Sequence, residues 1–99
     1  MRLSPEQITN IRNLTSQLAG ATARVWLFGS RVRDDARGGD VDLLLEMDCA
    51  VHEPALLSAN LSAQISRTML GRKVDVLIKA PNLLHLPIHD VALAHGVRL

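Results

Sequence analysis

Cysteine is nearly absent from this chain: Cys49 is the only one in 99 residues, so no disulfide bond can form within it. The four histidines do not combine with this cysteine at the spacing of a zinc site. A lone thiol without a metal pattern is typical of a reducing compartment. No apolar run approaches the roughly 20 residues of a membrane-spanning helix, and the first residues lack the apolar segment of a signal peptide. We therefore expect a cytoplasmic protein that does not associate with membranes.

Aromatic residues and net charge are equally scarce. Trp26 and Phe28 are the only tryptophan, tyrosine or phenylalanine residues, and the formal net charge is +1. Because single-stranded nucleic acid is usually bound by stacking bases on aromatic side chains in a basic groove, we do not expect direct binding of nucleic acid. Apolar residues nevertheless make up 47% of the sequence, enough for one hydrophobic core. We interpret residues 1–99 as a single domain, too short for a catalytic domain with a separate substrate domain.

Hydrophobic periodicity predicts an alternation of helices and strands. Three helices are expected to start at Pro5, Pro54 and Pro87 and to end at Gly20, Gly71 and Gly96. Ser4 and Gln7 form the capping box of the first helix. Strands are expected at residues 24–28, 41–47 and 73–78, and the apolar residues on both faces of the first strand suggest that it is covered on both sides.

The lengths of the connections predict how these strands pair. Only about ten residues separate the first two strands, fewer than a parallel crossover needs, so we expect an antiparallel pair joined by a turn and a short helix or loop. The helix between the second and third strands suits a right-handed parallel crossover. The fold class is therefore α/β (α+β), in the order α-β-(α)-β-α-β-α, with a mixed sheet of three or more strands packed against helices.

Three aspartates are expected to meet beside a small turn. Gly29 and Ser30 end the first strand, and after nine residues Asp40 and Asp42 open the second. Two carboxylates at i and i+2 share one face of a strand, about 6.5–7 Å apart along it. The predicted pairing brings Asp75, near the start of the third strand, to the same edge. Hard divalent cations favour such oxygen ligands, and a Gly-Ser turn offers N–H and hydroxyl groups to phosphate.

Each of these parts has an ordinary structural explanation when taken alone. An aspartate near the start of a strand is commonly a solvated end or a cap. Asp75, however, is a lone carboxylate in an aliphatic strand, and an unpaired buried carboxylate is costly. A metal ion or a substrate hydroxyl would explain its presence, and the combination favours metal-assisted phosphoryl or nucleotidyl chemistry.

At these residues the sequence resembles the minimal nucleotidyltransferases of the DNA polymerase β superfamily. That family has a Gly-Ser pair, about ten residues, Asp-x-Asp and a third acidic residue on a later strand, which Gly29-Ser30, Asp40-Val41-Asp42 and Asp75 match. The resemblance implies a nucleotidyltransferase fold over nearly the whole chain. It also implies that Asp40, Asp42 and Asp75 are catalytic and hold two Mg²⁺ ions, for which Mn²⁺ could substitute.

The resemblance further implies the substrates. Gly29 and Ser30 would hold the β- and γ-phosphates of ATP, and Arg31 and Arg33 are candidate phosphate ligands whose alternative is a solvated loop. Asp75 would help to activate the hydroxyl that attacks the α-phosphate with release of pyrophosphate. The loop between Gly29-Ser30 and Asp40 is one residue shorter than the commonest form in the family, so the resemblance does not determine which of its groups contact phosphate.

The smallest relatives are often encoded beside a helical, RNase-like partner of the HEPN class. Some transfer AMP to a tyrosine of that toxin and so act as its antitoxin, and the short chain agrees with an acceptor supplied by another macromolecule. The alternatives are an antitoxin that neutralises its partner by binding alone and a nucleotide-binding module that senses without transfer.

The remaining chemistry-bearing residues are given ordinary roles. His52, His85, His89 and His95 are expected at the surface or in partner contacts, and Cys49 in a loop or buried. The apolar residues Leu83, Leu84, Leu86, Ile88, Val91 and Leu93 exceed what one short helix must bury, so they either pack in the core or meet a partner or a second copy of the chain.

Overall fold

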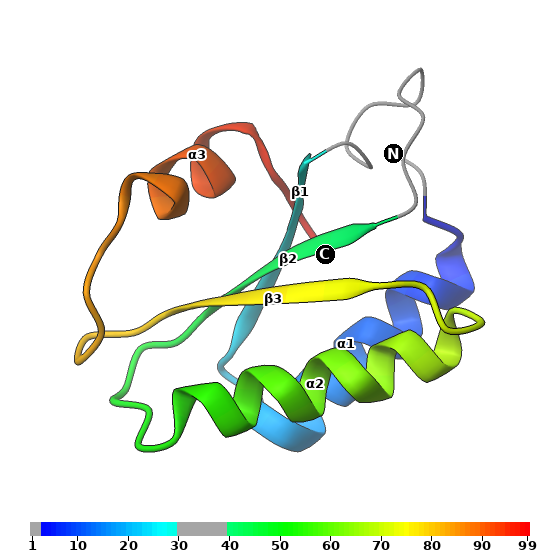
Figure 1. The fold of residues 1–99 in the computed structure, drawn as a ribbon, viewed down its shortest axis with the longest axis horizontal. Helices are drawn as coiled ribbons and strands as arrows, with labels where there is room; N and C mark the ends of the chain where they lie inside the picture. Colours follow the sequence, from blue (N-terminus) through cyan, green and yellow to red (C-terminus); the bar gives the residue numbers. More distant parts are fainter. Residues whose placement is uncertain (1–2, 30–39) are drawn as a thin grey trace.

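The computed structural model describes residues 3–29 and 40–99, whose elements follow the predicted order with one added strand (Figure 1). They are α1 (Pro5–Ala19), β1 (Arg24–Phe28), β2 (Val41–Glu46), α2 (Pro54–Thr68), β3 (Val74–Lys79), α3 (Pro87–His95) and β4 (Val97–Arg98). The short helix or loop expected between the first two strands lies outside the described residues. No described helix combines the length and apolar character needed to cross a bilayer.

Helix α1 begins as its sequence predicts. The Ser4 hydroxyl accepts a hydrogen bond from the Gln7 N–H, and the Gln7 side chain accepts one from the Ser4 N–H, so both halves of the capping box are formed. The helix ends at Gly20, whose φ of +99° lies in the region that favours glycine. This boundary sets the turn that leads into β1.

The sheet has the strand order β3-β2-β1-β4. Strand β1 pairs antiparallel with β2, and β2 pairs parallel with β3, which confirms the predicted connectivity. The small fourth strand, β4, pairs antiparallel with β1 and was not predicted. The pairing aligns the end of β1 with the starts of β2 and β3, so these three strand ends share one edge of the molecule.

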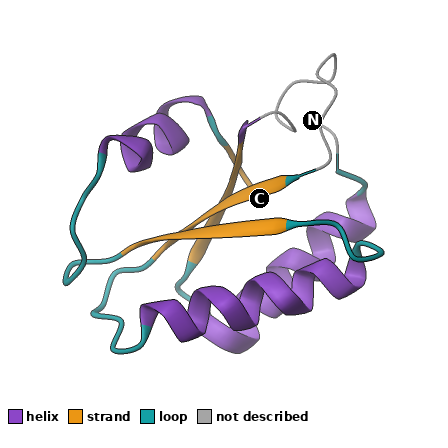
Figure 2. Ribbon diagram, viewed as in Figure 1, coloured by secondary structure: helices purple, strands orange, loops and turns teal. Residues whose placement is uncertain are grey.

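Helices α1 and α2 cover one face of the sheet, and α3 lies on the other (Figure 2). The main core lies on the α1 and α2 side and includes Val25, Leu43, Ile65 and their buried neighbours. The opposite face holds the alternate residues, among them Asp42 and the fully buried Leu44. On that face Trp26 and Phe28 are half-buried, so β1 is fully covered on the α1 and α2 side and partly covered on the α3 side.

Strand β3 is an outer strand whose free edge is occupied by side chains. The Lys73 carbonyl accepts from the Val41 N–H and the Lys79 carbonyl from the Met47 N–H, so these residues face β2 and the alternate ones face outward. The outward carbonyls accept hydrogen bonds from serine hydroxyls of α2: Ser58 to Val76, Ser62 to Val74 and Ser66 to Arg72. Helix α2 therefore closes the free edge of β3 as well as covering the core.

His89 holds α3 against the same strand. Its side chain is 2% exposed, so the expectation of a surface histidine was wrong for this residue. Its Nδ1 accepts from the Leu86 N–H at 2.8 Å, which leaves Nε2 to donate to the Ile78 carbonyl at 3.0 Å. The neutral Nε2–H tautomer of His89 thus extends the closure of the β3 edge beyond the serines.

The apolar residues around α3 are only partly packed. Leu83 and Leu93 are half-buried, whereas Leu84, Leu86, Ile88 and Val91 are exposed. Leu83 packs against the core, Leu93 is half-buried, and the remaining four present apolar surface to solvent.

Candidate active site

The strand register brings the predicted carboxylates to one edge of the sheet. Asp42, the second residue of β2, is the register partner of both Phe28 at the end of β1 and Asp75 in β3. Register partners on adjacent strands point to the same face, about 4.8 Å apart. Asp40 is exposed and comes directly before β2, so it shares this face with Asp42. The three aspartates therefore lie at neighbouring strand ends, as the predicted pairing requires, while their role as a site stays a prediction.

Gly29 lies against the Asp42 carboxylate. Its φ is +78°, and a Cβ atom added there would stand 2.4 Å from Oδ2 of Asp42 and 3.2 Å from Cγ. Only a residue without a side chain allows this approach. The backbone at the end of β1 and the first strand carboxylate of β2 therefore form one compact unit.

Asp42 is the electrostatic centre of the group. Burial, and then the negative charges of Asp75 and Asp40, raise the pKa of the Asp42 carboxyl above its ordinary value, while the Lys73 ammonium partly offsets this. Like charges held close together at a cleft or sheet edge are a common feature of functional sites. A bound cation would relieve this repulsion.

Asp75 differs from its prediction in one respect. Asp75 is exposed rather than buried, so the argument from the cost of burying an unpaired carboxylate does not apply to it. Its Oδ2 lies 3.6 Å from Nζ of Lys73, with side-chain exposures of 55% for Asp75 and 67% for Lys73. The sequence interpretation missed this lysine, although its position two residues before Asp75 places both on one strand face.

Carboxylate oxygens are the ligands that Mg²⁺ and Mn²⁺ prefer, and Asp40, Asp42 and Asp75 supply such oxygens on one face of the sheet. Burial raises the pKa of the Asp42 carboxyl most, and the charges of Asp75 and Asp40 raise it further, which a bound cation would offset. Among residues 3–29 and 40–99, however, no three Asp, Glu, His or Cys side chains stand close enough to hold a metal ion together. Asp75 is paired with Lys73 instead. The other predicted phosphate ligands, Ser30, Arg31 and Arg33, lie outside the described residues.

A second polar cluster lies at the opposite end of the same sheet face. Arg24 Nε donates to Glu46 at 2.8 Å, its terminal nitrogens donate to Asp48, and the Trp26 indole also donates to Glu46. The Arg24 hydrogen bonds lower the pKa of Glu46 and of Asp48. Lys79 adds a second positive charge, with Nζ 3.7 Å from Glu46, so two cations balance the two carboxylates and we interpret the cluster as structural.

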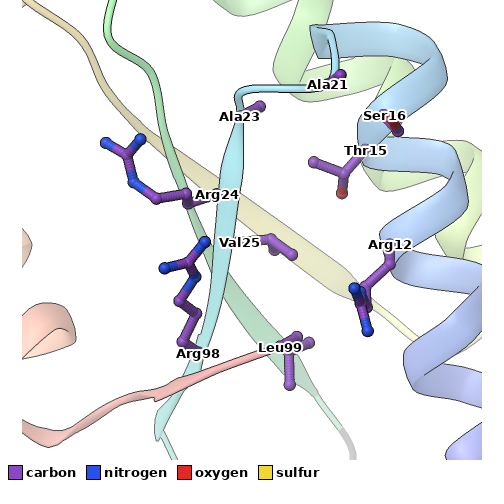
Figure 3. Close-up of a pocket in the computed structure, with 9 residues that line it drawn as sticks. All are labelled: Arg12, Thr15, Ser16, Ala21, Ala23, Arg24, Val25, Arg98 and Leu99. Carbon is purple, nitrogen blue, oxygen red and sulfur yellow. The ribbon is translucent and has the colours of Figure 1, made fainter.

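A hollow of about 180 Å³ lies between α1, β1 and β4 (Figure 3). Three arginines line it: Arg12, Arg24 and Arg98. Arg24 and Arg98 lie on one side of β1 and Arg12 on the other, toward α1, so the three guanidinium groups do not converge on one point (Figure 3). Of the predicted site residues, the four that the structure describes, Gly29, Asp40, Asp42 and Asp75, do not line this hollow.

The sheet, its two backing helices and the aspartates at the strand ends define a domain of the nucleotidyltransferase type. Comparison with known families agrees: residues 8–94 match a family described as nucleotidyltransferase domain. The chain belongs to this family, within the DNA polymerase β superfamily, and nucleotidyl transfer is its general activity. A search of curated proteins returned no match.

Proposed function

We propose that this chain is a Mg²⁺-dependent nucleotidyltransferase that moves AMP from ATP to a hydroxyl of a partner protein. The observation that carries the proposal is the register of Asp42 with Asp75, with the Gly29 backbone against the Asp42 carboxylate. Asp40, Asp42 and Asp75 would hold two divalent cations, and Gly29, Ser30, Arg31 and Arg33 the β- and γ-phosphates.

In the proposed reaction a hydroxyl oxygen of the acceptor forms a bond to the α-phosphorus as the bond to the β-phosphate bridge breaks. Pyrophosphate leaves, and the Asp75 carboxylate helps to activate the hydroxyl by accepting its proton. Bound divalent cations would stabilise the attacking and leaving oxygens. The edge position of Asp75, exposed beside Asp42, gives an acceptor access to this carboxylate.

The proposed acceptor is a HEPN-class, RNase-like toxin, which the transfer would inactivate, so that the chain acts as an antitoxin in the cytoplasm. This partner follows from the resemblance to minimal nucleotidyltransferases. The net charge of +1 and the two aromatic residues favour a protein acceptor over a nucleic acid.

Labelling of the partner tests the proposal directly. The purified chain, α-labelled ATP and Mg²⁺ are mixed with the protein encoded beside it, and we expect label on that protein together with pyrophosphate. Asp42→Asn should reduce labelling at least a hundredfold while the variant stays folded. Asp48→Asn, at the other end of β2, is the matched control and should label like the parent. Labelling that survives Asp42→Asn contradicts the assignment.

A second candidate is an antitoxin that acts by binding alone. The Lys73–Asp75 ion pair favours it, because Asp75 is paired with a lysine and no three acidic side chains among the described residues are placed to bind a metal ion. A cell-protection assay separates the two. If Asp40→Asn with Asp42→Asn protects cells from the partner as well as the parent does, binding without transfer is the better account.

A further inference from the structure

Lys73 lies within the group of aspartates but has no role in the reaction proposed above. Its carbonyl accepts from the Val41 N–H at 3.0 Å, which fixes its backbone beside the start of β2. Continuing the register of Val41 with Val74 by one residue places Lys73 next to Asp40. Lys73 and Asp75 are two residues apart on one strand. The lysine ammonium therefore shares a sheet face with all three carboxylates.

The ion pair that holds this ammonium is easily exchanged. Nζ of Lys73 lies 3.6 Å from Oδ2 of Asp75, beyond ordinary hydrogen-bond distance, and both side chains are more than half exposed. Exposed pairs of this kind are weak, and a lysine side chain has the rotational freedom to change partners. The pair is a contact that a competing charge can replace.

We propose that Lys73 is a positioning residue with two successive partners: the Asp75 carboxylate in the free protein, and the triphosphate of the nucleotide once divalent cations are bound. The inference rests on the proposed function. A cation taken up by the aspartates neutralises Asp75 and competes directly with the lysine. The ammonium released from Asp75 would then contact the triphosphate of a bound nucleotide, since lysine binds phosphate oxygens well.

Replacing Lys73 by methionine should change two measurements in opposite directions. Mn²⁺ binding to the nucleotide-free protein should tighten about two- to fivefold, because a competing cation is removed. The KM for ATP should rise about tenfold with kcat little changed, because a charged contact to bound nucleotide is lost. Lys73→Arg keeps the charge and should restore a KM within about threefold of the parent value.

Lys79 supplies a matched control within β3. It lies on the same strand face and pairs with Glu46 at 3.7 Å, but at the far end of the sheet from the aspartates. Lys79→Met should leave both Mn²⁺ binding and the KM for ATP at parent values. A general effect of lost charge or stability would instead appear in both variants.

The two measurements separate this inference from the proposed function. If Lys73→Met leaves Mn²⁺ binding unchanged, or shifts metal and nucleotide binding in the same direction, the role of Lys73 is overturned even when the parent transfers AMP. A parent that binds Mn²⁺ but transfers nothing overturns the proposed function, while the tightening of Mn²⁺ binding still supports Lys73. A parent that binds no Mn²⁺ overturns both.

Discussion

Gly29 joins backbone conformation to site geometry in a single residue. Its φ of +78° strains any residue with a Cβ atom, and the space such an atom would fill is taken by the Asp42 carboxylate. A substitution there changes two things at once: the backbone is strained, and the carboxylate has to rotate away. These two effects can be separated, because another glycine has only the first.

Gly29→Ala should reduce nucleotidyl transfer more than tenfold while destabilising the fold by about 1 kcal/mol. Gly71→Ala is the control, since Gly71 has a φ of +80° and an added Cβ meets nothing within 4 Å. The control should lose similar stability in urea unfolding and keep its activity. Equal losses of activity in the two variants would show that strain alone is responsible.

At the scale of the element, α2 stabilises β3 in two ways. Its apolar stripe, Leu61 and Ile65 among others, packs in the core, and its serines bond the outward carbonyls of the strand. An exposed strand edge is a template for pairing with other chains, and donors placed along it reduce that tendency. The serines thus protect the strand that carries Asp75.

Ser58→Ala combined with Ser62→Ala should lower the free energy of unfolding by about 2 kcal/mol, because two half-buried carbonyls lose their donors. The freed edge should also increase light scattering at high protein concentration. Ser16→Ala, on the exposed surface of α1, should change neither property. A double variant with the urea midpoint of the parent would show that the serines contribute nothing measurable.

The elements themselves were largely predictable from local signals. Proline starts and apolar runs located the helices and strands, and connection lengths determined their pairing. Glycine marked the ends of α1 and α3, whereas α2 ends at Thr68, before the predicted Gly71. Strand β4 was missed because its two residues show no periodicity after the helix-ending Gly96. His89 was missed because its partner, the Ile78 carbonyl, comes from a distant strand.

The candidate site was predictable to the level of strand faces but no further. The spacing of Asp40 and Asp42 and the register of Asp75 followed from pairing rules. The exposure of Asp75 did not follow from these rules, because it depends on how much of the second sheet face α3 leaves uncovered. The pairing of Asp75 with Lys73 could have been predicted, because the i, i+2 spacing that linked Asp40 to Asp42 also links these two residues.

Over the whole molecule, the two ends of one sheet face have opposite electrostatic character. At the aspartate end, burial and like charges raise the pKa of Asp42, so its ionisation opposes folding. At the other end, hydrogen bonds from Arg24 lower the pKa of Glu46 and Asp48, so their ionisation favours folding. The fold therefore tolerates an unfavourable charge at the end where a cation is proposed to bind.

This contrast predicts the pH dependence of stability in two variants. Asp42→Asn should raise the free energy of unfolding at pH 7 by about 0.5 kcal/mol, allowing for solvent screening of a half-buried group. Because the folded parent holds the Asp42 proton more tightly than the unfolded chain, this gain should fade as the pH falls and vanish below about 4, where both states are protonated.

Asp48→Asn should instead lower the free energy of unfolding at pH 7, and this loss should fade as acid protonates the parent carboxyl. Urea unfolding from about pH 2 to pH 8 measures both curves, because the pKa of Asp48 is lowered in the folded protein and its effect fades only below about pH 4. An Asp42→Asn variant less stable than the parent at pH 7 would mean that the carboxylate is already compensated in the free protein, and the electrostatic case for a cation at this edge would fail with it.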